Sequence, residues 1–154
     1  MFEYRVKISR VVDGDTVDAN IDLGFNIIHK ARIRMLGIDT PESRTRNKKE
    51  KALGLASKAR LKELIRAADK VTIRTSKDGK GKFGRVLATL EGTYSGIGGL
   101  KHSRNINQAM VSEGHARPYY GGSKNERGPW VVEEDGQWKR WTAKGYVELE
   151  EEER

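Results

Sequence analysis

Two short segments of the sequence concentrate carboxylate side chains. Asp13-Gly14-Asp15 has the composition of a tight turn, and Asp39-Thr40-Pro41-Glu42 follows a predicted strand. Carboxylates that lie close together raise each other's pKa unless a cation or an arginine compensates their charge. The chain has no cysteine, and its three histidines are scattered away from these segments. A hard divalent cation with oxygen ligands is therefore the natural candidate for binding there.

Two arginines could complete a phosphate-binding site beside these carboxylates. Arg34 stands five residues before Asp39 on a predicted strand, and its neighbours Ile33 and Met35 point to the opposite face. Arg85 opens a later strand. A guanidinium group offers a phosphate two parallel hydrogen-bond donors. A metal ion, a carboxylate base and an arginine pair are the groups that phosphoryl transfer to water requires.

The hydrophobic periodicity predicts how these residues come together. Apolar residues alternate with polar ones in three early segments, as in half-buried strands: residues 2–8, 17–23 and 31–35. Tight turns join these strands into an antiparallel meander. The turn after the first strand and the exit of the third strand then lie at the same end of the sheet. We therefore expect Asp13 and Asp15 to lie close to Asp39, Thr40 and Glu42.

The rest of the body alternates between helical and strand periods. The expected elements follow one another along the chain: a helix at about 49–69, strands at 71–75 and 86–90 around an Asp78-Gly79 hairpin, a loop at 91–104 and a short helix at about 106–113. This order predicts an α+β fold, a five-stranded OB-fold β-barrel with two or three packed helices.

The chain divides into two parts by composition. Residues 1–120 carry all the predicted elements and form the expected domain. Residues 121–129 are rich in glycine and polar residues, as in a flexible connector. The extension at 121–154 contains three tryptophans and an acidic end, and its pattern assigns it no element. We interpret the tryptophans as packing groups rather than as base-stacking platforms.

The net charge favours a polyanionic partner. The 154 residues carry a net charge of +8, and the seven C-terminal residues hold five Glu and one Arg. The remainder has 29 basic and 17 acidic residues, a net charge of +12. Such a surface suits nucleic acid, although a merely solvated basic surface fits the charge equally well. No apolar run approaches the roughly 20 residues of a membrane span, and no secretion leader is visible. We expect a cytoplasmic monomer, of host or phage origin.

Several motifs together resemble the staphylococcal-nuclease-like (thermonuclease) family. Three motifs match that family in order and spacing from about residue 5 to residue 90: Val12-Asp13-Gly14-Asp15-Thr16, Arg34 with Gly37-Ile38-Asp39-Thr40-Pro41-Glu42, and Lys82-Phe83-Gly84-Arg85. Asn107-Gln108-Ala109-Met110-Val111 with Gly114-His115-Ala116 also looks like the family's second helix and its exit, so the resemblance covers roughly residues 5–120. Any one motif alone would be a weak signal, whereas separated motifs in register are a strong one.

The resemblance implies a calcium-dependent nuclease that attacks DNA and RNA and leaves 3′-phosphates. Asp15 and Asp39 would hold Ca²⁺ through their carboxylates and Thr40 through its backbone carbonyl, with Asp13 supporting the metal from nearby. Arg34 and Arg85 would bind the scissile phosphate. Glu42 would orient the attacking water or remove its proton.

Substrate contacts are also implied by the resemblance. Lys82 and Phe83 would lie beside a phosphate next to the scissile one, and Tyr120 near the nucleotide. The family often has a tyrosine where this chain has Phe83, so one hydroxyl donor is missing. Lys82 and Tyr120 fit a solvated charge and a core aromatic equally well.

Two other functions remain to be weighed against the nuclease. Asp13-Gly14-Asp15 alone would be read as a polar turn, and Glu42 as an acidic residue at a helix N-terminus. A non-catalytic nucleic-acid-binding OB-fold module would be expected to lose the carboxylates or the arginines, and this chain keeps them. A structural or protein-interaction domain would leave the constellation of charges unexplained. The combination favours the enzyme.

Overall fold

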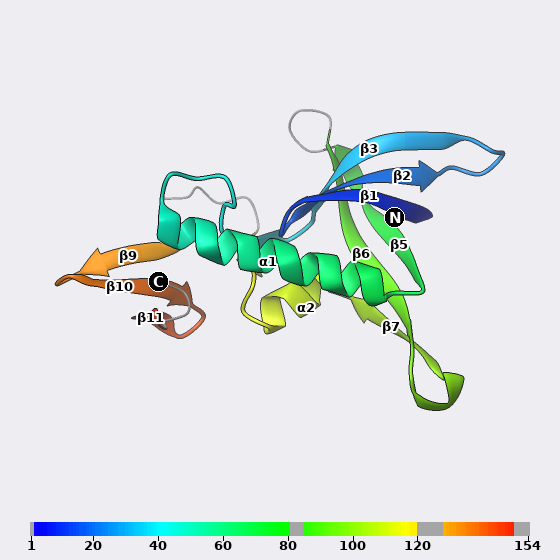
Figure 1. Ribbon diagram of the computed structural model, residues 1–154. Helices are drawn as coiled ribbons and strands as arrows, with labels where there is room; N and C mark the ends of the chain where they lie inside the picture. Colours follow the sequence, from blue (N-terminus) through cyan, green and yellow to red (C-terminus); the bar gives the residue numbers. More distant parts are fainter. Residues whose placement is uncertain (1, 81–84, 120–127, 150–154) are drawn as a thin grey trace.

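The computed structural model describes residues 2–80, 85–119 and 128–149 (Figure 1). Five strands close a barrel, and their bounds are β1 Phe2–Asp13, β2 Thr16–Asp22, β3 Ile28–Met35, β5 Lys70–Lys80 and β6 Val86–Ser95. Neighbours pair antiparallel in the order β3-β2-β1-β5-β6, and a parallel pairing of β3 with β6 closes the circle. The predicted α+β fold with a five-stranded OB-type barrel is confirmed.

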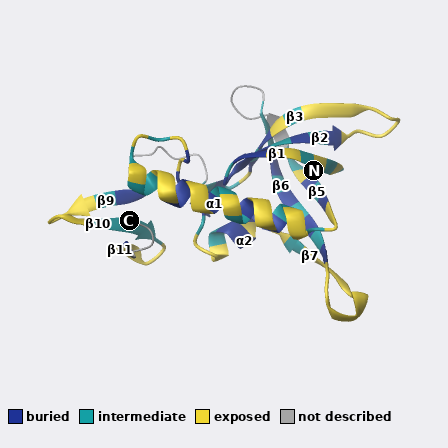
Figure 2. Cartoon of the chain, in the orientation of Figure 1, coloured by how far each residue is buried: buried dark blue, intermediate teal, exposed yellow. Residues whose placement is uncertain are grey.

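The alternation seen in the sequence points one face of each strand into the barrel. Val17, Ile33, Ile73 and Leu90 have no exposed surface and belong to one continuous core (Figure 2). β1 pairs with β2 on one side and with β5 on the other. Its pairing with β2 shifts register between Ile8 and Arg10 and again between Val11 and Asp13. Such bulges bend a long strand and redirect its side chains.

Two α-helices cover the barrel where the sequence predicts them. α1 spans Lys48–Ala67 and begins at Asn47, whose side chain accepts hydrogen bonds from the backbone amides of Lys49 and Glu50. α2 spans Ile106–Ser112. The buried Asn107 ties α2 to the barrel, because its amide group accepts from the Leu90 amide at 3.0 Å and donates to the Leu36 carbonyl at 2.9 Å.

The loop predicted at 91–104 is wrong. β6 continues to Ser95, a short 3-10 helix (η2) covers Ile97–Gly99, and β7 at Lys101–Asn105 pairs with β6. β7 lies at the edge of the sheet and consists of polar residues only, so it carries no apolar alternation that could have revealed it. A two-residue strand, β4 (Ile38–Asp39), pairs with another, β8 (Arg117–Pro118).

The C-terminal extension forms a second sheet. β9 (Val131–Glu134), β10 (Gln137–Thr142) and β11 (Gly145–Glu148) pair antiparallel in the order β11-β10-β9. Val131 and Leu149 pack with Leu53 of α1 in a small apolar cluster separate from the barrel core. Residues 120–127, which include most of the predicted connector, lie outside the described residues.

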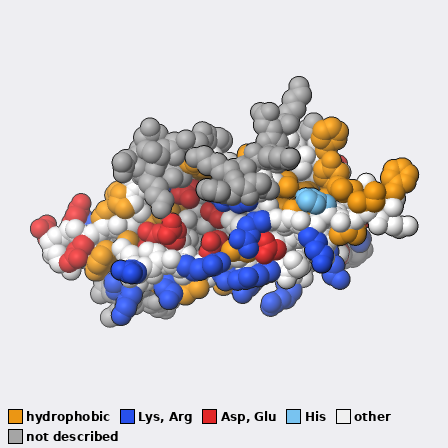
Figure 3. Space-filling model, turned by 90° about the horizontal axis from the view of Figure 1, so that it is seen from above, with side chains coloured by type: hydrophobic (Ala, Val, Ile, Leu, Met, Phe, Trp, Pro, Cys, Tyr) orange, Lys and Arg blue, Asp and Glu red, His pale blue; other side chains and the backbone are white. Residues whose placement is uncertain are grey.

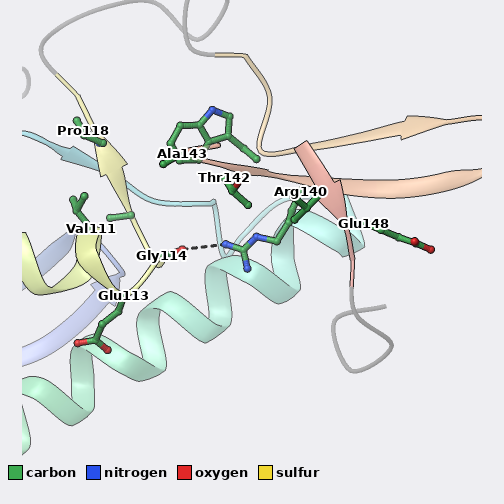
Figure 4. A pocket seen from close by; sticks show the side chains of 11 residues that line it. Val111, Glu113, Gly114, Pro118, Arg140, Thr142, Ala143 and Glu148 are labelled. Atoms are coloured by element: carbon green, nitrogen blue, oxygen red, sulfur yellow. Dashed lines mark hydrogen bonds between the residues drawn. The ribbon is translucent and has the colours of Figure 1, made fainter. Parts of the chain in front are cut away.

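The second sheet is also tied to the end of α2. Arg140 of β10 donates a hydrogen bond to the carbonyl of Gly114 at 3.0 Å, and a cavity of about 360 Å³ lies between the two parts of the fold (Figure 4). Among the residues predicted to do chemistry that the structure describes, none lines that cavity. Of the helices in the described ranges, none has both the length and the apolar character needed to cross a bilayer.

Candidate active site

A buried carboxylate lies where the meander brings its turns together. Asp15 follows the turn after β1 and is only 8% exposed. Its Oδ1 accepts a hydrogen bond from the Thr16 hydroxyl at 2.8 Å, and its Oδ2 accepts one from the Thr40 amide at 3.2 Å. The Thr40 bond joins the turn after β1 to the segment that leaves β4, as the antiparallel meander requires.

Arg34 stands between two carboxylates. Its Nη1 lies 3.4 Å from Oδ2 of Asp15, and its Nη2 lies 4.0 Å from Oδ1 of Asp39. Nη1 also donates to the backbone carbonyl of Met35 at 3.1 Å. The Arg34 side chain is only 14% exposed. One guanidinium group therefore links Asp15 and Asp39 at the end of the barrel where the sequence predicts them to meet.

Arg34 does not fully offset the cost of burying the Asp15 carboxylate. Burial is the main cause that raises the pKa of Asp15, and the nearby charge of Asp39 raises it further. The ion pair with Arg34 and the hydrogen bonds from Thr16 and Thr40 act in the opposite direction and do not cancel the effect of burial. A further cation at this place would stabilise the ionised form of the pair.

The donor set fits a hard cation only in part. Two carboxylates and the backbone of Thr40 offer oxygen ligands, and Mg²⁺ and Ca²⁺ accept such ligands together with water. Over the described ranges, however, no three acidic or histidine side chains converge in a way that could hold a metal ion. The single crowd of four carboxylates expected from the sequence is therefore wrong. Asp13 accepts a hydrogen bond from the Ser43 hydroxyl, and Glu42 is exposed at the rim.

Glu42 lines two cavities of the surface. A cavity of about 540 Å³ is lined by Asp13, Thr16, Glu42 and Arg85, among others. A second cavity of about 460 Å³ is lined by Asp39, Thr40, Glu42, Arg117 and Trp130, among others. Figure 3 shows acidic side chains near the middle of this face, with Lys and Arg side chains along one side of them. Arg85 lines the first cavity and Arg117 the second, so each cavity combines carboxylates with a cationic group that could bind a phosphate.

Two glycines allow α1 to approach the site. A Cβ atom on Gly54 would collide with the backbone of Glu42 and Ser43. A Cβ atom on Gly14 would lie 2.8 Å from Cβ of Ser57 and 3.1 Å from Cγ2 of Thr40. In addition, the Glu42 amide donates to Oε2 of Glu50 at 3.0 Å. The first turns of α1 therefore determine where the backbone of Glu42 lies.

Arg117 is part of the site but was not predicted from the sequence. It is 4% exposed, pairs with Asp39 across β4 and β8, and places Nε 3.3 Å from Oδ2 of that carboxylate. Its guanidinium carbon lies 4.2 Å from the ring centre of Trp130 and 5.3 Å from that of Trp141. The two rings belong to the C-terminal extension, and no sequence period connects them with residue 117. Trp130 and Trp141 therefore pack on Arg117, whereas Trp138 packs against the apolar cluster of Leu53, Val131 and Leu149.

Tyr119 is the other aromatic residue at the site. Its amide donates to the Gly37 carbonyl at 2.8 Å, and its ring centre lies 6.0 Å from Cζ of Arg34. The predicted substrate contacts Lys82, Phe83 and Tyr120 lie outside the described residues.

Comparisons with known proteins identify relatives of this chain. Residues 32–135 match the profile of the family described as Staphylococcal nuclease homologue. The endonuclease YhcR of Bacillus subtilis (strain 168) is 32% identical over 123 residues, which cover 77% of this chain and 9% of YhcR. A micrococcal nuclease of Shigella flexneri is 28% identical over 117 residues, covering 76% of this chain and 59% of the relative. Protein ParB of Escherichia coli is equally similar, with 58% of its length covered. The chain thus spans less than two thirds of each of these relatives.

Proposed function

The chain belongs to the family of staphylococcal nuclease homologues, and on that premise we propose that it is a nuclease that hydrolyses phosphodiester bonds in DNA and RNA with Ca²⁺. The observation that carries the proposal is the position of Arg34 between the carboxylates of Asp15 and Asp39. A buried carboxylate, a half-buried one and an arginine, beside hollows that also contain Glu42 and Arg85, suit a phosphate and a metal ion together. The names of two relatives, an endonuclease and a micrococcal nuclease, support the same class of reaction.

Asp15, Asp39 and the carbonyl of Thr40 would hold the cation, with Asp13 supporting it. A bound divalent cation would polarise the phosphate and neutralise charge that develops in the transition state. The raised pKa of Asp15 agrees with this role, because a carboxylate that is costly to ionise alone gains most from a cation. The choice of Ca²⁺ over Mg²⁺ rests on the family resemblance.

Arg34 and Arg85 would bind the non-bridging oxygens of the scissile phosphate. Their planar groups supply donors that are already oriented before the reaction, and this preorganisation stabilises the transition state. Glu42 would orient the attacking water or remove its proton, and its exposure at the junction of the two hollows leaves room for that water. Cleavage that leaves a 3′-phosphate breaks the bond between phosphorus and the 5′-oxygen of the next nucleotide.

We assign catalysis to residues 1–120 and treat residues 121–154 as an extension in which Trp130 and Trp141 pack on Arg117. Tyr119 packs beside Arg34 and adds an aromatic surface near the proposed phosphate. Lys82, Phe83 and Tyr120 are proposed as further substrate contacts from the resemblance alone.

Conservative substitutions test these roles. Arg34→Lys, Arg85→Lys and Glu42→Gln should each lower turnover of DNA by about 10²–10³-fold, because each removes a group aligned with the transition state. The matched control is Arg74→Lys on β5, since Arg74 is exposed and pairs with Glu3 and Glu91 outside the site. Its turnover should equal that of the unmodified protein. If the unmodified protein and all four variants bound DNA tightly and none of them cleaved it, the chain would instead be a non-catalytic binding module.

A further inference from the structure

A basic groove lies between β1 and α1, outside the site described above. Its volume is about 520 Å³, and its charged lining consists of four cationic residues: Arg10, Lys58, Lys62 and Arg66. No acidic side chain is among the lining residues. Such a groove suits an extended anion that carries several charges better than it suits a small anion with one charge.

The three cations on α1 form a regular stripe. Lys58, Lys62 and Arg66 are four residues apart, so they lie on one face of the helix at a rise of about 6 Å per step. One strand of duplex DNA places a phosphate about every 3.4 Å of its axis, so every second phosphate falls close to this spacing. The stripe therefore has a period that a nucleic-acid backbone can follow.

Neighbouring cations on the same helix behave differently. Arg60 is held by Glu113 at 2.6 Å and by Glu63 at 3.1 Å. By contrast, in the part of the chain that the structure describes, no ion pair joins Lys58, Lys62 or Arg66 to an acidic side chain. The charges of the stripe consequently remain available to an external polyanion. A row of Lys and Arg side chains runs along the edge formed by α1 in Figure 3.

The opposite wall of the groove comes from the bulged part of β1. The register shift between Ile8 and Arg10 places Ser9 and Arg10 at the groove, and the Ser9 hydroxyl donates to the Asp18 carbonyl at 3.1 Å. Arg10 also lies near Asp18, whose carboxylate is already paired with Arg32 at 2.8 Å. The apolar side chains of Ile8 and Ile65 complete the lining and can pack against sugar rings.

The groove is connected with the proposed active site through β1. Val11 lines the groove, whereas the next two residues, Val12 and Asp13, line the cavity that contains Glu42 and Arg85. We propose that this groove, lined by Arg10, Lys58, Lys62 and Arg66, is a second binding surface for the nucleic-acid backbone. It holds the substrate some nucleotides away from the phosphate that is cleaved. This inference rests on the proposed nuclease function and adds to it a preference for long substrates.

The test compares a groove variant with a control variant of equal charge. The groove variant carries Lys58→Gln, Lys62→Gln and Arg66→Gln. The control carries Lys30→Gln, Lys101→Gln and Lys144→Gln. These three exposed lysines lie on β3, on β7 and in the turn between β10 and β11, and Lys101 pairs with Asp69 at 3.7 Å. Binding of a DNA duplex of about 20 base pairs is measured by fluorescence anisotropy in EDTA over a range of salt concentrations. Cleavage of a dinucleotide substrate is measured separately with Ca²⁺.

We expect the groove variant to bind the duplex about tenfold or more weakly at low salt, with a salt slope reduced by up to about 3, since each lost phosphate contact contributes roughly 0.9. The control should lose much less, and both variants should cleave the dinucleotide like the parent. Equal affinities and slopes for the two variants would overturn the groove proposal while leaving the nuclease intact. Binding of the three proteins to anionic lipid vesicles is measured in parallel. If the groove variant lost vesicle binding without losing DNA binding, the result would overturn the proposal in favour of a membrane surface. Absence of dinucleotide and DNA cleavage by all three proteins would instead count against the nuclease function alone.

Discussion

Arg117 offers a quantitative test of how the C-terminal sheet supports the site. Arg117→Met keeps an apolar stem of similar length and removes the charge that lies 3.3 Å from Asp39. Removal of one partner from a buried ion pair costs about 3–5 kcal/mol. Asp39 is 19% exposed and keeps Arg34 at 4.0 Å, so its remaining charge is partly compensated. We therefore expect the lower end, a loss of about 3 kcal/mol in the free energy of unfolding.

Arg117→Lys separates charge from geometry. It retains the cation but removes the planar group that lies over the rings of Trp130 and Trp141 and that donates to the Gly128 carbonyl at 3.1 Å. Desolvated cation–π contacts contribute up to about 2 kcal/mol, so we expect a loss of about 1–2 kcal/mol. Urea unfolding followed by tryptophan fluorescence measures both variants. The tryptophan emission of the folded state should also change, because Trp130 and Trp141 lose the guanidinium group of Arg117 as a neighbour.

Arg104→Met is the matched control for this pair. Arg104 also has a carboxylate partner, Glu113 at 3.5 Å, and an aromatic neighbour, the Tyr94 ring at 5.9 Å, but its side chain is 39% exposed. A solvated pair of this kind contributes at most about 1 kcal/mol. If both Arg117 variants were as stable as the Arg104 control, the extension would not hold Asp39 through Arg117, and this part of the site description would be wrong.

Three further substitutions probe the site and its surroundings. Gly54→Ala should lower turnover, because the added Cβ collides with the backbone of Glu42; normal turnover would mean that α1 does not position Glu42. Burial, more than the nearby arginines, holds the pKa of His115 below its ordinary value, so stability is present above about pH 6.5 and is lost as pH falls through the folded-state pKa. His115→Gln should flatten that decline in urea unfolding at several pH values, and an unchanged profile would assign the decline to other groups. The pKa of Asp15 is raised mainly by burial, so its ionised form costs stability as pH rises through that pKa. In EDTA at neutral pH Asp15→Asn should therefore stabilise the fold, and a loss of stability would mean that the Arg34 pair outweighs burial.

The parts of the fold with strong local periodicity could be predicted, and the parts that depend on pairing partners could not. The apolar alternation of β2 and β3 and the helical stripe of α1 are properties of short segments, so they are visible in the sequence. β7 forms because β6 offers it an edge, and its own residues carry no such signal.

The C-terminal sheet contained one signal that could have been used. Asp135 and Gly136 have φ angles of 52° and 79°, which is the backbone of a two-residue hairpin turn, and Asp-Gly is a typical sequence for it. Charged residues within and between β9 and β10 conceal the alternation of apolar and polar residues in these strands. The candidate residues Asp15, Arg34 and Asp39, which the structure brings together, could be proposed because their motifs are separated but in register. Arg117 was missed because its partners Trp130 and Trp141 come from a part of the chain with no assigned element.

In the proposed reaction, the carboxylate pair at the end of the barrel works with a divalent cation to hydrolyse nucleic acid. The most direct measurement is cleavage of one DNA substrate by the intact chain with Ca²⁺, in excess EDTA, and after Ca²⁺ is restored, with Asp39→Asn in parallel. We expect cleavage that stops in EDTA, returns with Ca²⁺ and is strongly reduced by Asp39→Asn, while circular dichroism shows an intact fold. Full cleavage in excess EDTA, or undiminished cleavage by Asp39→Asn, would contradict the claim.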